Sequence, residues 1–165
     1  MPFRWSTTST PIGDLLLVAT QDGLARVAFG CEDFDAVLRA LQDGSGEHAA
    51  QHDAPEAEAQ LAEYFAGERR QFDIALDWRL ATGFRGAVQR ALCGIDYGRT
   101  QSYSELARRL GNPKAVRAVG SGCATNLLPI VVPCHRVLRS DGSLGGYRGG
   151  LSIKQHLLDL EAAHV

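Results

Sequence analysis

The chain has 165 residues, of which 45% are hydrophobic and 22% charged, and its formal net charge at pH 7 is −2. This composition is typical of a soluble globular protein whose core fills one large domain or two small ones. No run approaches the roughly 18 apolar residues needed to span a bilayer, and residues 1–20 lack the pattern of a secretory signal. We therefore expect a cytoplasmic protein without a membrane partner.

Four cysteines, at positions 31, 93, 123 and 134, are too few and too irregularly spaced for a disulfide framework. A reducing compartment would keep them as thiols. No Cys-x-x-Cys pair is present, and we expect neither a metal ion nor a cofactor.

The charge is unevenly distributed along the chain. Residues 1–78 carry 5 Arg and 14 Asp or Glu, a formal charge of −9, whereas residues 79–165 carry 12 Lys or Arg and 5 Asp or Glu, a formal charge of +7. Such asymmetry favours a polyanionic partner for the basic half. A solvated basic face without a partner is the alternative that composition leaves open.

Residues 1–76 predict a small mixed α/β domain. Residues 15–19 and 24–29 are largely apolar runs joined through Asp22-Gly23, which is typical of a β-hairpin. Residues 72–76 alternate between apolar and polar and predict a returning strand.

Helical spacing of apolar residues appears twice in this half, over residues 33–41 and 56–65, and Gly67 ends the second helix. Residues 43–55 are rich in small and polar types and predict a surface loop. Residues 77–83 are the expected linker to a second, mainly helical domain over residues 84–165.

The second domain begins with an amphipathic helix over residues 84–92. One side of that helix is expected to be buried and holds Phe84, Ala87, Val88, Ala91 and Leu92. A helix over residues 152–160 closes the chain, with Glu161 near its end.

A helix-turn-helix is predicted between these two helices. Ser102 precedes Glu105 by three residues, a capping-box pattern that starts a helix at Tyr103. The Gly-Asn-Pro of residues 111–113 ends it, and its proline suits the first turn of the next helix, which runs through Gly120. Any two-helix corner has a similar pattern, so the motif is weak by itself.

The pattern with the most chemical content is Pro-Cys-His-Arg-Val at residues 133–137. The apolar run of residues 129–132 predicts a short buried strand that delivers Cys134 to a rigid site. A thiol becomes a nucleophile only after losing its proton, and His135 is a candidate base. Successive strand residues point to opposite faces, so contact between the two requires a turn or a bridging water. An inert buried thiol is the alternative.

Residues 82–161 resemble the active domain of the O6-alkylguanine-DNA alkyltransferases. The shared motifs are Ser102-Tyr103, residues 111–120, Asn126, residues 133–137, Gly146-Tyr147-Arg148, Lys154 and Glu161. Residues 9–13 and 61–67 resemble the amino-terminal domain of the same family. The resemblance implies an α+β fold in which a small mixed α/β domain precedes a helical domain with a helix-turn-helix.

The resemblance also implies the function: a DNA repair methyltransferase that moves the alkyl group of O6-alkylguanine onto its own cysteine, once and irreversibly. The damaged base must first be rotated out of the duplex. The implied partner is double-stranded DNA containing alkylated guanine, bound through its minor groove by a monomer, with cooperative binding along DNA left open. A non-reactive lesion-binding relative and a cysteine hydrolase are the alternatives.

The family's catalytic roles carry over to five positions. Cys134 is the nucleophile, His135 acts on it through a water, and Glu161 orients and charges the imidazole. Asn126 corresponds to a hinge that ties the recognition helix to the active-site loop. Tyr103 is the donor to a ring nitrogen of the purine.

The remaining implied residues contact DNA or the extruded base. Arg117 fills the gap that the base leaves in the stack. The other expected DNA contacts are Lys114, Ala115, Ala118, Gly120 and Arg108. The expected base pocket includes Val137, Tyr147, Arg148 and Gly149. The sequence departs from the family pattern at Arg85, Gln89, Asp96 and Leu127, where packing and hinge geometry are affected.

Overall fold

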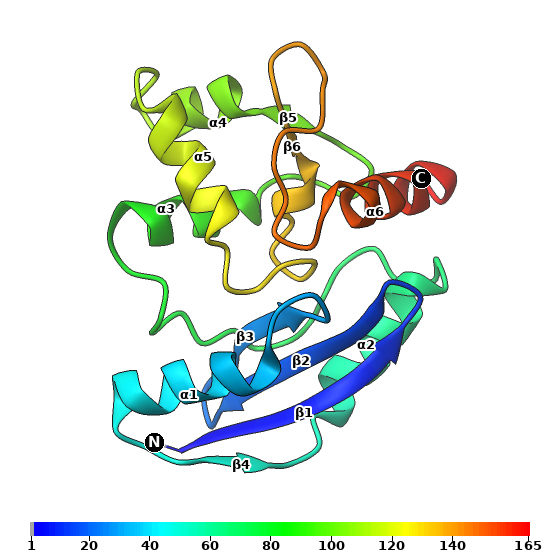
Figure 1. Ribbon diagram of the computed structural model, residues 1–165. Coiled ribbons are helices and arrows are strands. Elements are labelled where there is room, and N and C mark those ends of the chain that lie inside the picture. Colours follow the sequence, from blue (N-terminus) through cyan, green and yellow to red (C-terminus); the bar gives the residue numbers. More distant parts are fainter. Residues whose placement is uncertain (1) are drawn as a thin grey trace. The chain divides into compact units, whose positions relative to one another are not determined.

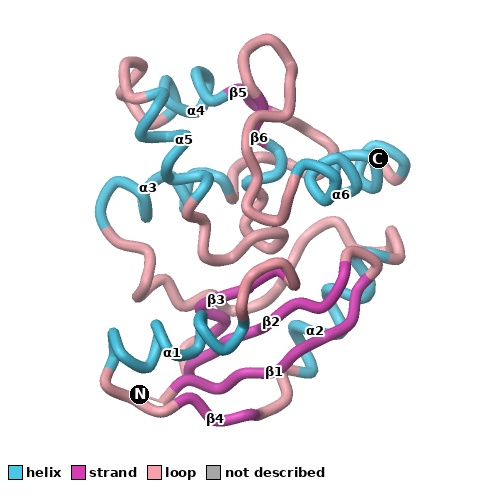
Figure 2. Tube along the Cα trace, viewed as in Figure 1, coloured by secondary structure: helices cyan, strands magenta, loops and turns pink. Residues whose placement is uncertain are grey.

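The computed structural model describes residues 2–165, which form two compact units, Met1–Leu80 and Ala81–Val165. The elements of the first unit are β1 (Phe3–Thr10), β2 (Gly13–Thr20), β3 (Gly23–Phe29), α1 (Phe34–Ser45), β4 (Ala49–Gln51) and α2 (Pro55–Phe65) (Figure 1). Those of the second unit are α3 (Gly83–Leu92), β5 (Gln101–Ser102), α4 (Tyr103–Arg109), α5 (Val116–Ala124), the 3₁₀ turn η1 (Cys134–Arg136), β6 (Val137–Leu138) and α6 (Leu151–Ala163). The second unit is mainly helical and the first combines a sheet with helices (Figure 2). The fold is therefore of the predicted α+β class.

The first unit is built on a four-stranded sheet in the order β3-β2-β1-β4. The predicted hairpin is confirmed as β2 and β3, which pair antiparallel around the Asp22-Gly23 turn. The prediction of a loop over residues 43–55 is wrong in part, because α1 continues to Ser45 and β4 pairs parallel with β1. A strand of three residues is too short to show alternation, and its conformation is imposed by pairing with β1.

Both faces of the sheet are buried, because α1 lies on one side and α2 on the other (Figure 1). Leu16 and Val18 of β2 belong to the core cluster that includes Leu38 of α1. Strand alternation places Leu15 and Leu17 on the opposite face, and they are equally buried. A run of four buried apolar residues is therefore expected in β2.

Residues 72–76 do not form the predicted strand. Of these residues only Leu76 pairs with a strand, through an isolated bridge to Leu24. Two backbone hydrogen bonds define this bridge: Leu24 N donates to Ala75 O at 2.8 Å, and Asp77 N donates to Leu24 O at 2.8 Å. The segment crosses the edge of β3 at a single point, so alternation in its sequence was not evidence of a ladder.

Helices α3 and α5 pack closely in the second unit. The buried side of α3 differs from the prediction: Phe84 is 40% exposed and Ala87 is exposed, whereas Val88, Gln89 and Leu92 are buried. The burial follows from the position of α5, whose Gly122 lies directly against the side chain of Val88.

Glycines 120 and 122 of α5 offer a matched test of this packing. A Cβ on Gly122 would lie 2.7 Å from Cβ of Val88, whereas a Cβ on Gly120 would meet nothing within 4 Å. We expect Gly122→Ala to lower the free energy of unfolding by about 1–3 kcal/mol through overpacking. Gly120→Ala should raise it by roughly 0.5–1 kcal/mol, because alanine favours the helix. Urea denaturation measures both, and equal effects would contradict this contact.

The predicted capping box at the start of α4 is confirmed. Glu105 N donates to Ser102 Oγ at 3.0 Å, and Ser102 N donates to Glu105 Oε2 at 2.9 Å. Helix α4 ends at Arg109, and the turn after it contains Gly111, whose φ of +74° favours glycine. Between them, α4, this turn and α5 form the two-helix arrangement expected of a helix-turn-helix.

The start of α5 was predicted too early. The proline of residues 111–113 and Lys114 lie in a turn, which a hydrogen bond from Ala115 N to Asn112 O closes at 3.0 Å. Helical bonding begins when Val119 N donates to Ala115 O at 2.9 Å. Lys114 therefore precedes the helix, and Arg117 is its second residue.

Within residues 2–165, none of the helices combines the length and apolar composition that crossing a bilayer requires.

Candidate active site

Cys134 lies in a 3₁₀ turn and not at the end of the predicted strand. Residues 129–132 are mostly buried, as expected, but they form a tight turn in which Ile130 has a φ of +75°. Val132 N donates to Leu128 O at 2.8 Å, and Cys134 N donates to Val132 O at 2.9 Å. A left-handed residue reverses the chain direction, which a continuous strand cannot do. The chain continues from this turn into β6, which pairs with β5.

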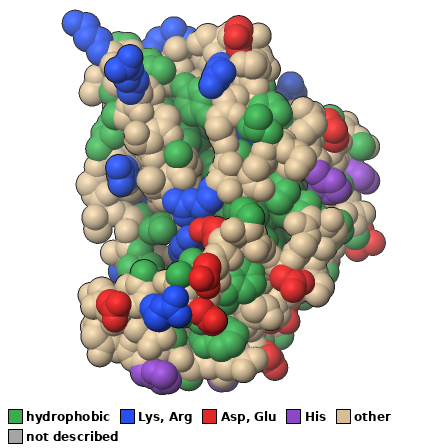
Figure 3. Space-filling model, in the orientation of Figure 1, with side chains coloured by type: hydrophobic (Ala, Val, Ile, Leu, Met, Phe, Trp, Pro, Cys, Tyr) green, Lys and Arg blue, Asp and Glu red, His purple; other side chains and the backbone are tan. Residues whose placement is uncertain are grey.

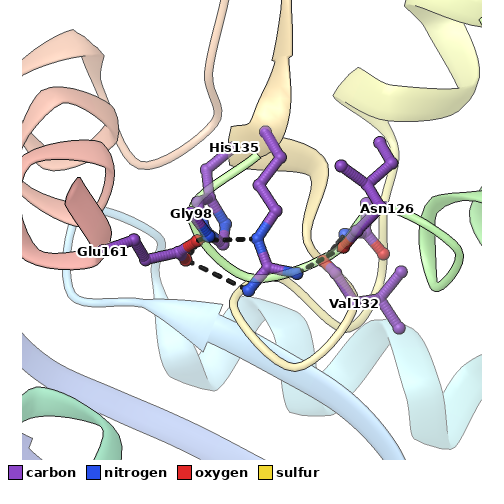
Figure 4. A network of polar contacts seen from close by, with 7 residues as sticks. Gly98, Asn126, Val132, His135 and Glu161 are labelled. Carbon is purple, nitrogen blue, oxygen red and sulfur yellow. Dashed lines mark hydrogen bonds and ion pairs between the residues drawn. The ribbon is translucent and has the colours of Figure 1, made fainter. Parts of the chain in front are cut away.

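Asn126 holds this turn at both ends. Its Nδ2 donates to Val132 O at 2.8 Å, and its Oδ1 accepts from Leu128 N at 3.1 Å (Figure 4). A β-branched residue in the left-handed region costs on the order of 1–3 kcal/mol, and the buried bonds of Asn126 offset this strain at Ile130. Asn126 is therefore a structural clamp on the loop that carries Cys134.

Gln89, one of the departures from the family pattern, has a defined role in this clamp. Its side chain is 3% exposed. Its Nε2 donates to Gly122 O at 3.3 Å and to Thr125 O at 3.1 Å. These are carbonyls at the end of α5, where helices leave acceptors unsatisfied. Gln89 thus fixes the end of α5 immediately before Asn126.

Glu161 of α6 lies at the centre of a buried polar network (Figure 4). Its Oε2 is 2.5 Å from Nε2 of His135, and its Oε1 accepts from Arg136 Nε at 2.8 Å. Gly98 N donates to the same Oε1 at 3.0 Å, and Arg136 donates a second bond to Oε2 at 3.2 Å. The side chain is only 2% exposed, so Glu161 is not a solvent-exposed acid even though it lies near the end of its helix.

These donors decide the ionisation of Glu161. Burial alone would raise its pKa, but the hydrogen bonds and charges of His135 and Arg136 outweigh burial and lower the pKa to about 2. The carboxylate is therefore ionised at neutral pH and can only accept hydrogen bonds.

His135 is fully buried, and burial lowers its pKa more than Glu161 raises it. A neutral imidazole beside an ionised carboxylate must carry its proton on Nε2. The lone pair then lies on Nδ1, which has no hydrogen-bond partner among the residues that the structure describes. Nδ1 is therefore a buried atom that is able to accept a proton.

Cys134 is 6% exposed, and burial raises the pKa of its thiol. Hydrogen bonding to Asn126 and the charges of Lys154 and Arg148 oppose that rise. The pKa of the neighbouring Cys123 is raised to about 12 by burial and by Cys134, and only Lys154 opposes that rise. Of these two thiols, Cys134 is the one with a hydrogen bond from Asn126 as well as a nearby positive charge.

Lys154 is the residue whose role sequence reasoning missed. Although fully buried, its Nζ donates to Val137 O at 2.7 Å and also to Leu144 O. Burial lowers its pKa, while Cys134 and Cys123 raise it. The signal was present in the sequence, because Lys154, Leu157 and Glu161 share one face of α6 at helical spacing.

The other predicted residues fall into two groups. Tyr103 is half-buried, and its pKa is raised by burial and by Cys123 and Cys134, which places it near both sulfurs. In the pocket group, Val137 and Gly149 are buried and Tyr147 and Arg148 are half-buried.

The DNA group lies elsewhere on the second unit. Lys114, Arg117 and Ala118 are exposed, and Ala115 and Gly120 are half-buried. Lys and Arg side chains stand out on the surface around α4 and α5 (Figure 3). The structure thus separates a buried polar cluster around Cys134 from a basic surface at the start of α5.

Among residues 2–165, no group of three or more His, Cys, Asp or Glu side chains is arranged to hold a metal ion.

Acid should destabilise the protein in two stages. The pKa of His135 lies below its ordinary 6.5, so only the unfolded chain gains that proton as pH falls through about 6.5. Between pH 4.5 and 2, Glu161 is protonated in the unfolded chain alone. This second stage costs roughly 3 kcal/mol. Urea denaturation from pH 7 to 3 measures the loss, and Glu161→Gln should lack the second stage. A free energy of unfolding that is flat over this range would contradict both assignments.

A buried cysteine followed in the chain by a neutral imidazole that an ionised carboxylate holds is typical of proteins that use cysteine as a nucleophile. The family model described as "6-O-methylguanine DNA methyltransferase, ribonuclease-like domain" matches residues 3–78, and "6-O-methylguanine DNA methyltransferase, DNA binding domain" matches residues 83–163. The chain belongs to this family of cysteine alkyltransferases.

Individual relatives agree over nearly the whole chain. The constitutive methylated-DNA–protein-cysteine methyltransferase of Bacillus subtilis is 40% identical over 158 residues, covering 95% of this chain and 94% of that protein. The corresponding protein of Mycolicibacterium paratuberculosis is 41% identical over 161 residues, covering 98% and 93%. The crystal structure of Mycobacterium tuberculosis OGT in complex with DNA is similar with a TM-score of 0.85 and 37% identity, covering 100% of this chain and 95% of that one.

Proposed function

We propose that this protein repairs DNA by transferring the alkyl group of O6-alkylguanine onto the sulfur of Cys134. The observation that carries the proposal is a buried Cys134 directly followed by a neutral His135 whose Nε2 is bound to Glu161 at 2.5 Å, within a family of cysteine alkyltransferases. The roles of individual residues below are part of the proposal.

The reaction is a displacement at the alkyl carbon. Nδ1 of His135 accepts the thiol proton through a water, and the sulfur of Cys134 attacks the carbon. The carbon–oxygen bond breaks, and its electron pair stays on the guanine. Tyr103 donates toward a ring nitrogen of the purine, and the backbone N–H of Arg148 binds the oxygen. The thiol proton replaces the alkyl group on the base, so the balance closes with unmodified guanine.

The product explains why one molecule repairs one lesion. A thioether at Cys134 has no leaving group that would regenerate the thiol, and its site is 6% exposed. The protein is therefore consumed stoichiometrically.

The DNA partner is contacted through the second unit. The exposed Arg117 and Ala118 at the start of α5 fit the minor groove, with Arg117 replacing the extruded base in the stack. The formal charge of +7 over residues 79–165 supplies sequence-independent affinity. We propose that the protein binds alkylated duplex DNA as a monomer.

Mass spectrometry tests the proposal directly. The protein is incubated with an oligonucleotide that contains O6-methylguanine, digested, and examined at each of the peptides holding its four cysteines. One methyl group on the Cys134 peptide is the expected result. An unmodified protein that still binds the oligonucleotide indicates a non-reactive lesion-binding protein, and repeated turnover of an ester indicates a cysteine hydrolase.

Replacing Arg117 should separate base extrusion from chemistry. We expect Arg117→Ala to slow methyl transfer from duplex DNA by at least about tenfold, because extrusion costs a few kcal/mol. Reaction with free O6-methylguanine base should be nearly unchanged. Arg108→Ala, which removes an exposed positive charge on α4 and an expected DNA contact outside the base stack, is the matched control for lost affinity. Equal slowing with both substrates would remove the extrusion role of Arg117.

A further inference from the structure

Arg136 is an inward-facing arginine in a domain whose other functional arginines are expected at the DNA surface. It is 6% exposed. Its Nε and a terminal nitrogen bind the two oxygens of Glu161, and its other terminal nitrogen donates to Ile95 O at 2.6 Å. The guanidinium carbon also lies 5.7 Å from the centre of the Tyr97 ring. All three nitrogens of the guanidinium therefore bond to groups within the domain.

The fork of Arg136 leaves Glu161 fully occupied. Oε1 accepts from Arg136 Nε and Gly98 N, and Oε2 accepts from His135 Nε2 and Arg136. Planar two-point binding of this kind fixes the orientation of a carboxylate. The carboxylate therefore cannot rotate away from the imidazole, and its negative charge is already balanced by the guanidinium.

This balance has a consequence for His135. A lone buried carboxylate stabilises an imidazolium, as in the serine–histidine–aspartate arrangement. Here the anion at 2.5 Å is accompanied by a cation bonded to both of its oxygens. Glu161 therefore orients the imidazole without charging it, which differs from the role expected from the sequence.

We propose that Arg136 is a positioning residue of alkyl transfer, because its clamp on Glu161 keeps His135 neutral with the Nδ1 lone pair available for the thiol proton. The inference rests on the function proposed above. It assigns to Arg136 the control of the protonation state of His135, a property separate from the presence of the nucleophile.

Other charged groups around His135 act in the same direction or lie further out. Burial is the main cause that lowers the pKa of His135, Glu161 is the anion that raises it, and Arg136 and Lys154 on α6 act together with burial. The thiol of Cys134 is adjacent in the chain. Cys93, at the end of α3, is close enough to Arg136 for the guanidinium charge to oppose the rise that burial causes in the pKa of its thiol.

Three variants separate charge from geometry. Arg136→Met removes the charge and the donors, Arg136→Gln removes the charge but keeps an N–H donor, and Arg136→Lys keeps the charge without the fork. Near-ultraviolet circular dichroism shows which of them fold. ¹⁵N NMR of the His135 ring reports its tautomer and protonation, after assignment among the five histidines. Single-turnover methyl transfer is measured at pH 6 and pH 8.

In the unmodified protein we expect a neutral ring protonated on Nε2 at both pH values, and similar rates. In Arg136→Met or Arg136→Gln, His135 should be protonated at pH 6, and the rate at pH 6 should fall about tenfold relative to pH 8, which is the effect expected when about one imidazole in ten remains neutral at pH 6. Arg136→Lys should leave His135 neutral and slow transfer equally at both pH values.

A folded charge-removing variant with an unmodified His135 tautomer and an equal loss of rate at both pH values would overturn the inference. If Arg136→Met does not fold, Arg136→Gln decides the question by the same readouts. Failure of the proposed function is distinguishable: the unmodified protein would then transfer no methyl group, while the NMR comparison would still report the protonation of His135.

Discussion

Replacing Cys134 by serine should abolish alkyl transfer while leaving binding to alkylated duplex DNA within about twofold of the original affinity, because affinity depends chiefly on phosphate contacts. A serine hydroxyl is far less acidic and far less nucleophilic towards an alkyl carbon than a thiol, so we expect no displacement of the alkyl group by position 134. The turn around position 134 should be unchanged, since Cys134 N donates to Val132 O from the backbone.

The matched control is Cys123→Ser. Cys123 is buried on α5 and lies close enough to Cys134 for that thiol to add to the effect of burial, and the resulting pKa of about 12 keeps Cys123 protonated. We expect this variant to accept a methyl group on Cys134 at a similar rate. Methylation of Cys123 in the Cys134→Ser variant, measured by peptide mass, would show that the nucleophile has been assigned to the wrong sulfur.

Removal of Glu161 should have the largest effect on stability. Glu161→Ala leaves the buried Arg136 guanidinium without its counter-ion and the Nε2 of His135 without its acceptor. Breaking a buried ion pair from one side costs about 3–5 kcal/mol, a large fraction of the stability of an ordinary domain. Urea denaturation at pH 7 measures the loss.

Asp159 supplies the control for that variant. It lies on the same helix, two residues earlier, and is exposed, and its Oδ1 accepts a hydrogen bond from Gln155 Nε2 at 2.8 Å. Asp159→Ala should change the free energy of unfolding by less than about 0.5 kcal/mol. Glu161→Gln, which keeps the shape, shows whether transfer also depends on the charge. A cost for Glu161→Ala no larger than that of Asp159→Ala would contradict the network described here.

Short motifs predicted the chemistry of the site better than they predicted its geometry. Cys134, His135 and Glu161 were assigned from residue types and family resemblance, and the last two are in direct contact. The local conformation was predicted wrongly at residues 129–132. Burial of that run was correct, but four apolar residues do not show that Ile130 adopts a left-handed conformation, which the side-chain hydrogen bonds of Asn126 on either side of it stabilise.

The partners of Arg136, Lys154 and Gln89 were beyond sequence reasoning for a related reason. Each side chain is buried by helices that are far apart in sequence, and each is satisfied mainly by contacts from other segments. Charged and polar side chains such as these are expected to be exposed unless the groups that accept their hydrogen bonds are known. The capping box at Ser102 was predictable, in contrast, because both of its partners lie within four residues.

The placement of the cysteines affects how long the protein stays active in a cell that is exposed to alkylating agents. Cys31 and Cys93 are exposed, whereas Cys134 is enclosed. Small electrophiles dissolved in the surrounding water reach the sulfurs of Cys31 and Cys93 first. The sulfur of Cys134 therefore stays available for alkylated bases in DNA. Each copy is thus a single-use reagent protected from the agents that create its substrate, and the number of intact copies sets how many lesions can be erased.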